Sequence, residues 1–294
     1  MHDAVRKAAI KDQEAAGIDI ITDGELQRDN MIDYFTERLP GVQVDLGSKR
    51  FYYDFYETQV RSKLATGSLG LTEEVRFLRK YSEHPAKVSV SGPHTLVKRI
   101  RNNYYPTEEA FALDLGRTLN FELKELARAG ATELQIDEPY YSGFPEDLPW
   151  AVKAIYAAVD GVDAHVTLHI CYGNRYGKPS FEGSYRYLFP TVLEAKVHAL
   201  SLEFARRGEE DIQLFKEFKA PFTLGLGVID VKTQEIEPPA LVADRIRRAL
   251  EIVPAERLVI NPDCGCVHLP RDVAFSKLAA MVEGTRMVRA ELGK

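Results

Sequence analysis

The sequence predicts an α/β fold, a (β/α)8 barrel of the TIM type, from three observations. Short runs rich in β-branched and apolar residues alternate with stretches of helical spacing, which is the pattern of a parallel sheet. No GxGxxG turn follows the first run, as a doubly wound dinucleotide-binding sheet would have. Polar residues suited to chemistry follow nearly every run, where a barrel places its active site.

Seven runs are predicted as strands, and the stretches around them as helices. The strands are 18–22, 87–90, 133–136, 166–170, 199–204, 222–228 and 258–260. The helices are 3–16, 71–81, 107–129, 146–159, 190–197, 208–218, 238–251 and 272–292. Because the chain opens with the helix that should follow an eighth strand, we expect the barrel to lack its first strand. We favour a sequence that begins one strand late over a barrel that is open or completed by another segment.

The chain contains no linker, repeat or low-complexity tract, so we expect residues 1–294 to form a single catalytic domain. One excursion interrupts the alternation. Residues 41–68, around Gly47 and Ser48, have the pattern of a β-hairpin.

Composition excludes several classes of protein. The chain has 294 residues, with 38 Lys and Arg against 44 Asp and Glu, a net charge of −6. The charges are scattered, so we expect no nucleic-acid partner. No apolar run approaches the roughly 18 residues of a membrane span, and the polar N-terminal helix is not a signal peptide, so we expect a cytoplasmic protein without a membrane partner. The odd count of three cysteines indicates reduced thiols.

A candidate metal site carries the strongest chemical signal. His169 and Cys171, two residues apart on one predicted strand, point to the same side. Cys264, in INPDCGC, and Glu203, in LSLEFA, follow other strands, and a barrel brings strand ends together. A buried Cys or a lone His is alone more often structural, but the four together form a set suited to Zn²⁺. Cys266 is either a substitute ligand, a spare thiol or a buried side chain.

Carboxylates follow three further strands on the same predicted face. Glu25 lies in ITDGE, Asp137 and Glu138 in QIDEP, and Asp230 in GVID. Such carboxylates hold a substrate ammonium, or else they are solvated loop residues and helix caps. We place Glu25 and Asp137 first as substrate ligands. Ser91, in SGPH, offers a hydroxyl to a substrate, with an ordinary turn as the alternative.

The motifs of this sequence, spread over essentially the whole chain, together resemble those of a known family. TDGELQRDNMIDYF, SVSGPHT, QIDEP, HICYGN, LSLE, GVIDV and INPDCG together resemble the catalytic domain of cobalamin-independent methionine synthase and its shorter archaeal and bacterial relatives. The resemblance implies a barrel whose catalytic zinc binds the thiol of homocysteine. The zinc ligands that it implies are His169, Cys171, Glu203 and Cys264. It also implies that Glu25 and Asp137 bind the amino group of homocysteine.

The chain departs from the family at three points. It starts after the Gly-Ser motif of the family's first strand, which helps to bind the homocysteine carboxylate. LVKRIRNNYY replaces a tryptophan-containing segment, and Lys232 stands where methylfolate-using members have a histidine. Lys232 and Asp230 are therefore the predicted catalytic pair.

The missing histidine bears on the methyl donor. A folate N5 anion needs a proton to leave, whereas a cobalt(I) corrinoid does not. We therefore predict a zinc-dependent methyltransferase that makes methionine from homocysteine. A methylcorrinoid protein or methylcobalamin is favoured over methyltetrahydrofolate as the donor.

Two other functions are weighed against this prediction. A zinc alkyltransferase acting on another thiol, resembling epoxyalkane:coenzyme M transferases, would share the HxC…C arrangement. Glu25 and Asp137 favour an α-amino thiol instead, because coenzyme M has no ammonium for them to bind. A non-catalytic zinc-binding barrel is disfavoured by the complete set of four ligands.

Overall fold

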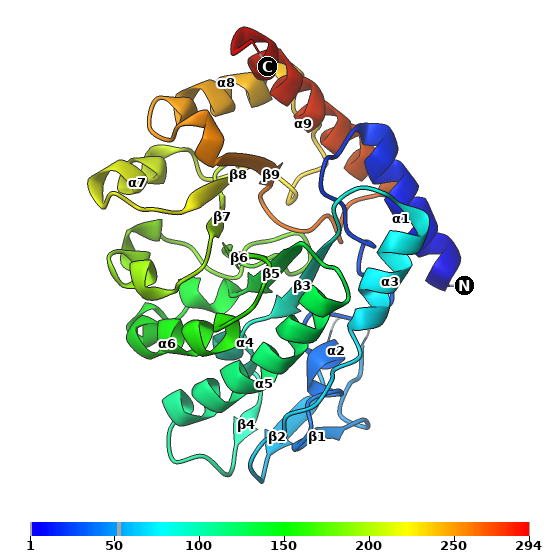
Figure 1. The fold of residues 1–294 in the computed structure, drawn as a ribbon, viewed down its shortest axis with the longest axis vertical. Coiled ribbons are helices and arrows are strands. Elements are labelled where there is room, and N and C mark those ends of the chain that lie inside the picture. The colour runs from blue at the N-terminus through cyan, green and yellow to red at the C-terminus, as the bar shows by residue number, and fades with distance from the viewer. Residues whose placement is uncertain (1, 52–53, 294) are drawn as a thin grey trace.

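A parallel sheet of six strands forms the centre of the computed structural model, which describes residues 2–51 and 54–293 (Figure 1). The strands, in spatial order, are β3 (Lys87–Ser91), β5 (Glu133–Asp137), β6 (His165–Ile170), β7 (Ala199–Glu203), β8 (Thr223–Ile229) and β9 (Leu258–Pro262). Every neighbouring pair is parallel. Sequential parallel pairing with a crossover after each strand is the order of a barrel, not of a doubly wound sheet.

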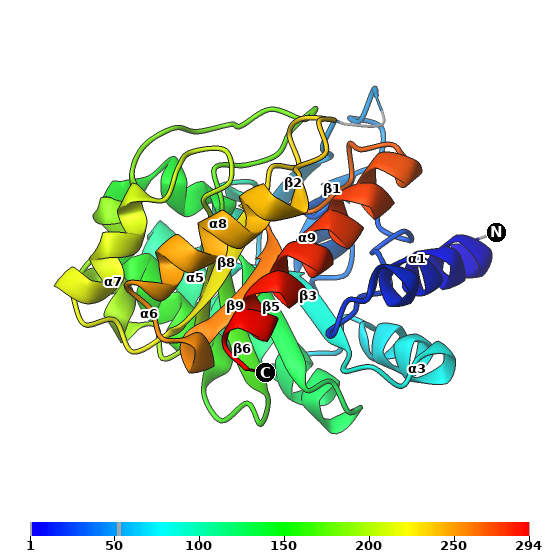
Figure 2. The ribbon, with the colours of Figure 1, turned by 90° about the horizontal axis from the view of Figure 1, so that it is seen from above.

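Helices surround the sheet on its outside, as Figure 1 shows. The longer ones are α1 (His2–Ala16), α3 (Thr72–Tyr81), α5 (Glu108–Arg128), α6 (Leu148–Val159), α8 (Pro239–Leu250) and α9 (Arg271–Glu291), with the short α2 (Asp33–Thr36), α4 (Pro93–Val97) and α7 (Gln213–Glu217) between them. In Figure 2, α8 and α9 lie together over β8 and β9, and they contact these strands. None of the helices in the described part of the chain has the length and apolarity that a membrane span requires.

Alternation along each strand separates the core from the barrel interior. In β6, Val166, Leu168 and Ile170 belong to the hydrophobic core that the helices share. The intervening Thr167 and His169 are buried polar residues. Because successive side chains point to opposite faces of a strand, the apolar set faces the helices and the polar set faces inward. The barrel interior is therefore available for a polar site.

Six of the seven predicted strands are confirmed, and the first one is wrong as a strand. Of residues 18–22, only Ile21 pairs, in a single parallel bridge with Ala86. The Ile21 N–H donates to the Pro85 carbonyl at 3.0 Å, and the Lys87 N–H donates to the Ile21 carbonyl at 2.9 Å. Among the described residues, no strand pairs with the other side of Ile21 or with the free edge of β9. The segment around Ile21 therefore has a partner on one side only, and its pairing does not extend beyond one bridge.

Two predicted helices are shorter than expected. Residues 190–197 form only a 3₁₀ turn, Thr191–Glu194, and 208–218 form the 3₁₀ turn Glu210–Ile212 followed by α7. The backbone reverses into the left-handed region at Lys196 and Lys219, with φ of 56° and 48°, which ends a helix there.

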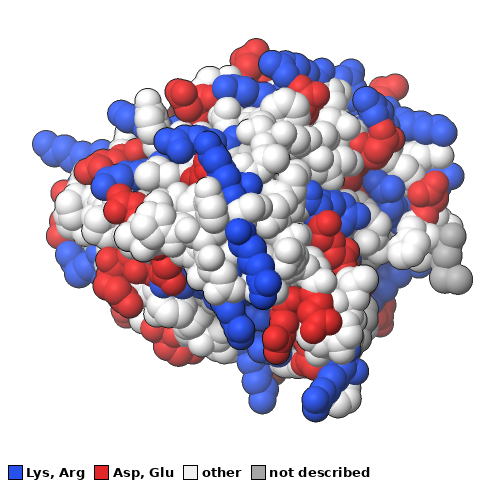
Figure 3. Space-filling model, turned by 90° about the horizontal axis from the view of Figure 1, so that it is seen from below, with Lys and Arg blue, Asp and Glu red and all other residues white. Residues whose placement is uncertain are grey.

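The predicted hairpin is present and is larger than expected. β1 (Val42–Asp45) pairs antiparallel with β2 (Glu57–Val60), and β4 (Arg101–Asn102) adds a short parallel strand beside β2. Residues 52 and 53 of this excursion lie outside the described residues. On the face drawn in Figure 3, basic and acidic side chains are interspersed, in line with the scattered charges of the sequence.

Candidate metal and substrate site

Strand register brings predicted site residues into one row at the carboxyl ends of the strands. Ser91 of β3 lies opposite Asp137 of β5, Asp137 lies opposite His169 of β6, and His169 lies opposite Ser201 of β7. All four strands are parallel, so their carboxyl ends meet at one edge. The catalytic face of a barrel is this edge.

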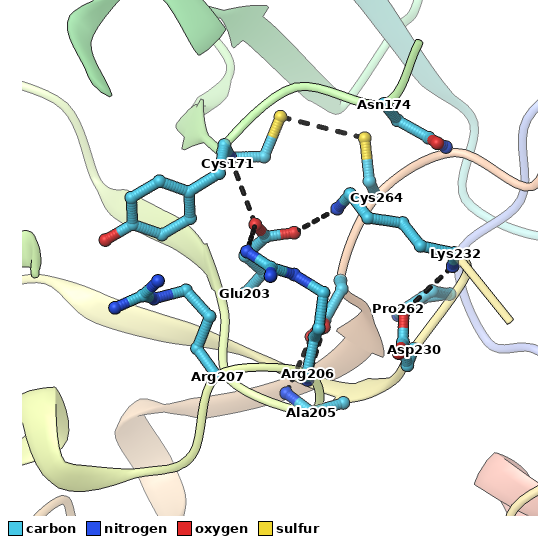
Figure 4. A network of polar contacts seen from close by, with 12 residues as sticks. Cys171, Asn174, Glu203, Ala205, Arg206, Arg207, Asp230, Lys232, Pro262 and Cys264 are labelled. Carbon is cyan, nitrogen blue, oxygen red and sulfur yellow. Dashed lines mark hydrogen bonds and ion pairs between the residues drawn. The ribbon is translucent and has the colours of Figure 1, made fainter. Parts of the chain in front are cut away.

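Three side chains of the types that bind metal ions converge beside this row. His169, Cys171 and Cys264 each offer one ligand atom, and these atoms all lie within 4.8 Å of one another. The Sγ atoms of Cys171 and Cys264 are 3.7 Å apart (Figure 4). His169 and Cys171 are buried at the end of β6, and Cys264 reaches them from the loop after β9. Residues 93 positions apart in the sequence thus meet at one point.

The environment of the two sulfurs shifts the pKa values of their thiols in opposite directions. The hydrogen bond that the sulfurs share lowers the pKa of Cys264 well below its ordinary value, and His169 and Lys232 add to this effect against the cost of burial. The same hydrogen bond, with burial, raises the pKa of Cys171. A thiolate beside an imidazole suits a soft divalent metal.

Glu203, the fourth predicted ligand, is not part of this cluster. Its carboxylate ends β7, is fully buried, and accepts the Tyr172 N–H at 3.1 Å on one oxygen. The other oxygen accepts the Lys232 ammonium at 2.5 Å. Figure 4 shows this ammonium pointing at the Glu203 carboxylate, beside the Cys264 side chain. Burial is the largest effect on the pKa of Lys232 and lowers it, but the charge and hydrogen bond of Glu203, together with Cys264 and Cys171, raise it above its ordinary value.

The two carboxylates predicted to bind an ammonium lie near each other. Asp137 accepts a hydrogen bond from the Gln135 amide at 2.7 Å. Burial raises the pKa of Asp137, and the nearby His169 lowers it by a smaller amount. Glu25 has a left-handed backbone, with φ of 54°, accepts the Ser89 hydroxyl and lies 3.2 Å from Arg28. The negative charge of Asp137 contributes to the raised pKa of Glu25, so the two carboxylates are close neighbours.

The other predicted residues are engaged with protein groups. The Ser91 hydroxyl is buried and donates to the Met31 carbonyl. Asp230 accepts the backbone N–H of Lys232 at 2.8 Å. Cys266 lies outside the metal-ligating cluster, and burial raises its pKa to about 11.

Asp263 is a residue that the sequence reading missed. Its carboxylate accepts the backbone N–H groups of Phe204, Ala205 and Arg206 at 3.0, 2.9 and 3.0 Å. These groups follow Glu203 directly, and Asp263 itself precedes Cys264. One side chain therefore joins the loops after β7 and β9. In the sequence, its position directly before the candidate ligand Cys264 in INPDCG could have pointed to it.

Glu138 acts as a helix cap, which was the structural alternative to binding a substrate. It is fully buried and accepts the N–H groups of His94 and Thr95 at the start of α4, at 2.9 and 2.8 Å, and the Thr95 hydroxyl at 2.7 Å. A Cβ atom at Gly92 would lie 2.2 Å from this carboxylate, so only glycine fits there.

The site as a whole combines one imidazole and two cysteine sulfurs with the carboxylates of Asp137 and Glu25. Comparisons with known proteins find similar chains. Residues 1–287 match the family model described as the catalytic domain of cobalamin-independent synthase. A methionine synthase of Saccharolobus islandicus is 38% identical over 288 residues, 97% of this chain and 83% of that protein, and one of Sulfolobus acidocaldarius is 37% identical over 97% and 81%.

A solved structure extends the likeness to three dimensions. The B12-independent methionine synthase of Shewanella sp. W3-18-1, in complex with selenomethionine, superposes with a TM-score of 0.87 at 32% identity, covering 99% of this chain and 88% of that one. The methyltransferase from Methanosarcina mazei shares the fold, with a TM-score of 0.66. The predicted TIM-barrel fold is thereby confirmed.

Proposed function

The chain belongs to the cobalamin-independent methionine synthase family, a family of homocysteine methyltransferases, and from this premise we propose how its site methylates the homocysteine thiol to form methionine. The observation that carries the proposal is the convergence of His169, Cys171 and Cys264 at the carboxyl ends of the strands. A methyl acceptor thiol is a poor nucleophile at neutral pH, because most of it is protonated. The site must therefore supply the means to hold a thiolate.

We assign these three residues as ligands of a zinc ion, with Glu203 beside them as the fourth predicted ligand. One imidazole and two thiolates within 4.8 Å fit zinc by donor type and number. When bound, zinc would keep the acceptor thiol deprotonated at neutral pH. Three thiols that stay reduced fit the cytoplasm as the place of action.

We assign Glu25 and Asp137 to the amino group of homocysteine. Burial raises the pKa of both carboxylates, and the charge of Asp137 adds to the rise for Glu25, so an ammonium that enters beside them relieves this cost. Orienting the substrate by this end directs its sulfur toward the cluster, because Asp137 lies in register with His169. The selenomethionine complex of the Shewanella relative supports a site for an amino acid of this kind.

For the methyl donor we propose two candidates, methyltetrahydrofolate and a methylcorrinoid. The names of the relatives point to a donor other than cobalamin. The ion pair between Lys232 and Glu203 favours the corrinoid, because an ammonium already bound by a carboxylate is a poor proton donor to a folate nitrogen.

The experiment measures zinc per chain in the purified protein and methyl transfer to homocysteine with each donor in separate reactions. We expect one zinc per chain and methionine formation with one donor. No zinc would refute the ligand assignment. One zinc without methionine from either donor would refute the proposed reaction.

A further inference from the structure

A buried ion pair lies beside Glu25, one of the two carboxylates assigned to the substrate ammonium. The Arg28 guanidinium is 3.2 Å from Glu25 Oε2 through Nη1 and 2.6 Å from Glu74 Oε2 through Nη2. The side chains of Arg28 and Glu74 are 3% and 4% exposed, whereas the side chain of Glu25 is 38% exposed. A ligand can therefore reach Glu25, but it cannot reach the pair beside it.

All three nitrogens of the Arg28 guanidinium have acceptors. Nε and Nη2 donate to the Glu74 carboxylate at 3.3 and 2.6 Å, and Nη2 also donates to the Ser89 carbonyl at 3.0 Å. Nη1 faces Glu25 and donates to the Ser89 hydroxyl at 3.5 Å. The ring of Tyr34 lies 5.1 Å from the guanidinium carbon. These contacts fix the positive charge of Arg28 in one place next to Glu25.

Glu74, in the first turn of α3, accepts hydrogen bonds on both carboxylate oxygens. Besides Arg28, the Gln27 amide donates to Oε1 at 2.8 Å and the Tyr34 hydroxyl donates to Oε1 at 3.1 Å. Burial raises the pKa of Glu74, and the charge and hydrogen bond of Arg28 oppose this rise. Since every partner is a donor, the contacts fit an ionised carboxylate. Glu74 therefore sets a negative charge against the guanidinium.

The charges around Glu25 favour an ammonium because Glu74 is present. Glu25 and Arg28 alone form a neutral pair, in which the guanidinium competes with an incoming cation for the same carboxylate. Glu74 returns this group of three to a net negative charge. Asp23, which also acts on Glu25, is already balanced by Arg6 at 2.8 Å. Without Glu74, a buried and unbalanced guanidinium would repel the substrate ammonium.

We propose that Glu74 is a positioning residue that determines substrate specificity, because by binding Arg28 and balancing its charge it leaves Glu25 free to bind the ammonium of an α-amino thiol. This inference rests on the proposed function. It adds to that function a residue of an outer helix that touches neither the substrate nor the metal-ligating cluster.

The test is a ratio of two dissociation constants, measured by calorimetry on the zinc-loaded protein. The ligands are homocysteine and 4-mercaptobutyrate, which is the same molecule without the amino group. Because both carry the thiol and the carboxylate, effects on the metal and on the rest of the site cancel in the ratio. We expect Glu74→Gln to lower the preference for homocysteine at least tenfold, through weaker binding of homocysteine alone.

A double variant provides the readout that structural damage would not produce. Arg28→Gln, added to Glu74→Gln, removes the unbalanced guanidinium, so the preference should return to within threefold of wild type. Glu122→Gln is the matched control. Glu122 is fully buried and accepts the N–H groups of Leu69 and Leu71, just before α3, at 2.5 and 2.7 Å. This variant should keep the preference within threefold of wild type.

Other results would overturn the inference. Glu74→Gln with a preference that falls less than tenfold, or with an equal loss of affinity for both thiols, would show that Glu74 does not act on the ammonium. A double variant that stays more than threefold below wild type would show that Glu74 does not act by balancing Arg28. If Glu74→Gln does not fold, Glu74→Ser takes its place under the same expectations.

Failure of the proposed function would give a different result. A wild type that binds the two thiols equally would refute the assignment of Glu25 and Asp137 to the amino group, whatever the variants do. The two failures are therefore distinguishable.

Discussion

Replacing Asp263 with asparagine tests how the fold holds the site together. An asparagine in the same orientation keeps one oxygen, which still accepts the N–H groups of Phe204 and Ala205. Its NH₂ group faces the Arg206 N–H, whose partner is lost. An unpaired donor costs about 1–3 kcal/mol, and two bonds that lose a charged acceptor cost about 1 kcal/mol each. We expect a loss of about 3–5 kcal/mol in the free energy of unfolding.

The assay is urea unfolding at pH 7.5 together with zinc affinity. Because Asp263 directly precedes Cys264 and ties its loop to the residues after Glu203, zinc affinity should fall at least tenfold. Glu122→Gln is the control. Glu122 is fully buried and accepts the N–H groups of Leu69 and Leu71 at 2.5 and 2.7 Å, far along the chain from the cluster. It should lose about 2–4 kcal/mol by the same reasoning and keep its zinc affinity.

Two results would refute this reasoning. A loss below about 1 kcal/mol in Asp263→Asn would mean that the three N–H groups find other partners. An equal fall of zinc affinity in both variants would mean that the site responds to general destabilisation and not to Asp263.

Three further predictions concern the site and its surroundings. Cys264→Ser should reduce zinc to well below one per chain by atomic absorption, and Cys266→Ser should leave it at one; full zinc in the first variant would exclude Cys264 as a ligand. Asp137→Asn should weaken homocysteine at least tenfold more than 4-mercaptobutyrate, which has no amino group, because only homocysteine loses an ion pair; equal losses would place the ammonium elsewhere. Burial lowers the pKa of His94, against the bond to its carboxylate partner, so the unfolded chain binds the extra proton first below about pH 6.5. Urea unfolding at pH 7.5 and 5.5 should show a loss of up to about 1.4 kcal/mol per pH unit that His94→Gln lacks, and identical pH slopes would contradict it.

The sequence by itself determined the barrel and the neighbourhood of the site. Strand and helix periods are properties of the local backbone, so six strands and the long helices follow from spacing alone. The two-residue spacing of His169 and Cys171 places both on one side of a strand for the same reason. The strand-end positions of Asp137, Glu203 and Cys264 are enough to bring them to one face, because parallel strands share a carboxyl edge.

Only the tertiary structure decided which of these residues touch. The first predicted strand became a single bridge because pairing depends on neighbours, and Ile21 has one on one side alone among the described residues. Cys264 joined the cluster and Cys266 did not, although they differ by two positions in a loop whose path has no repeating period. The pairing of Lys232 with Glu203 and the hold of Asp263 on three N–H groups connect residues 29 to 59 positions apart. Such contacts depend on how the loops pack against one another, and local sequence patterns carry no information about that packing.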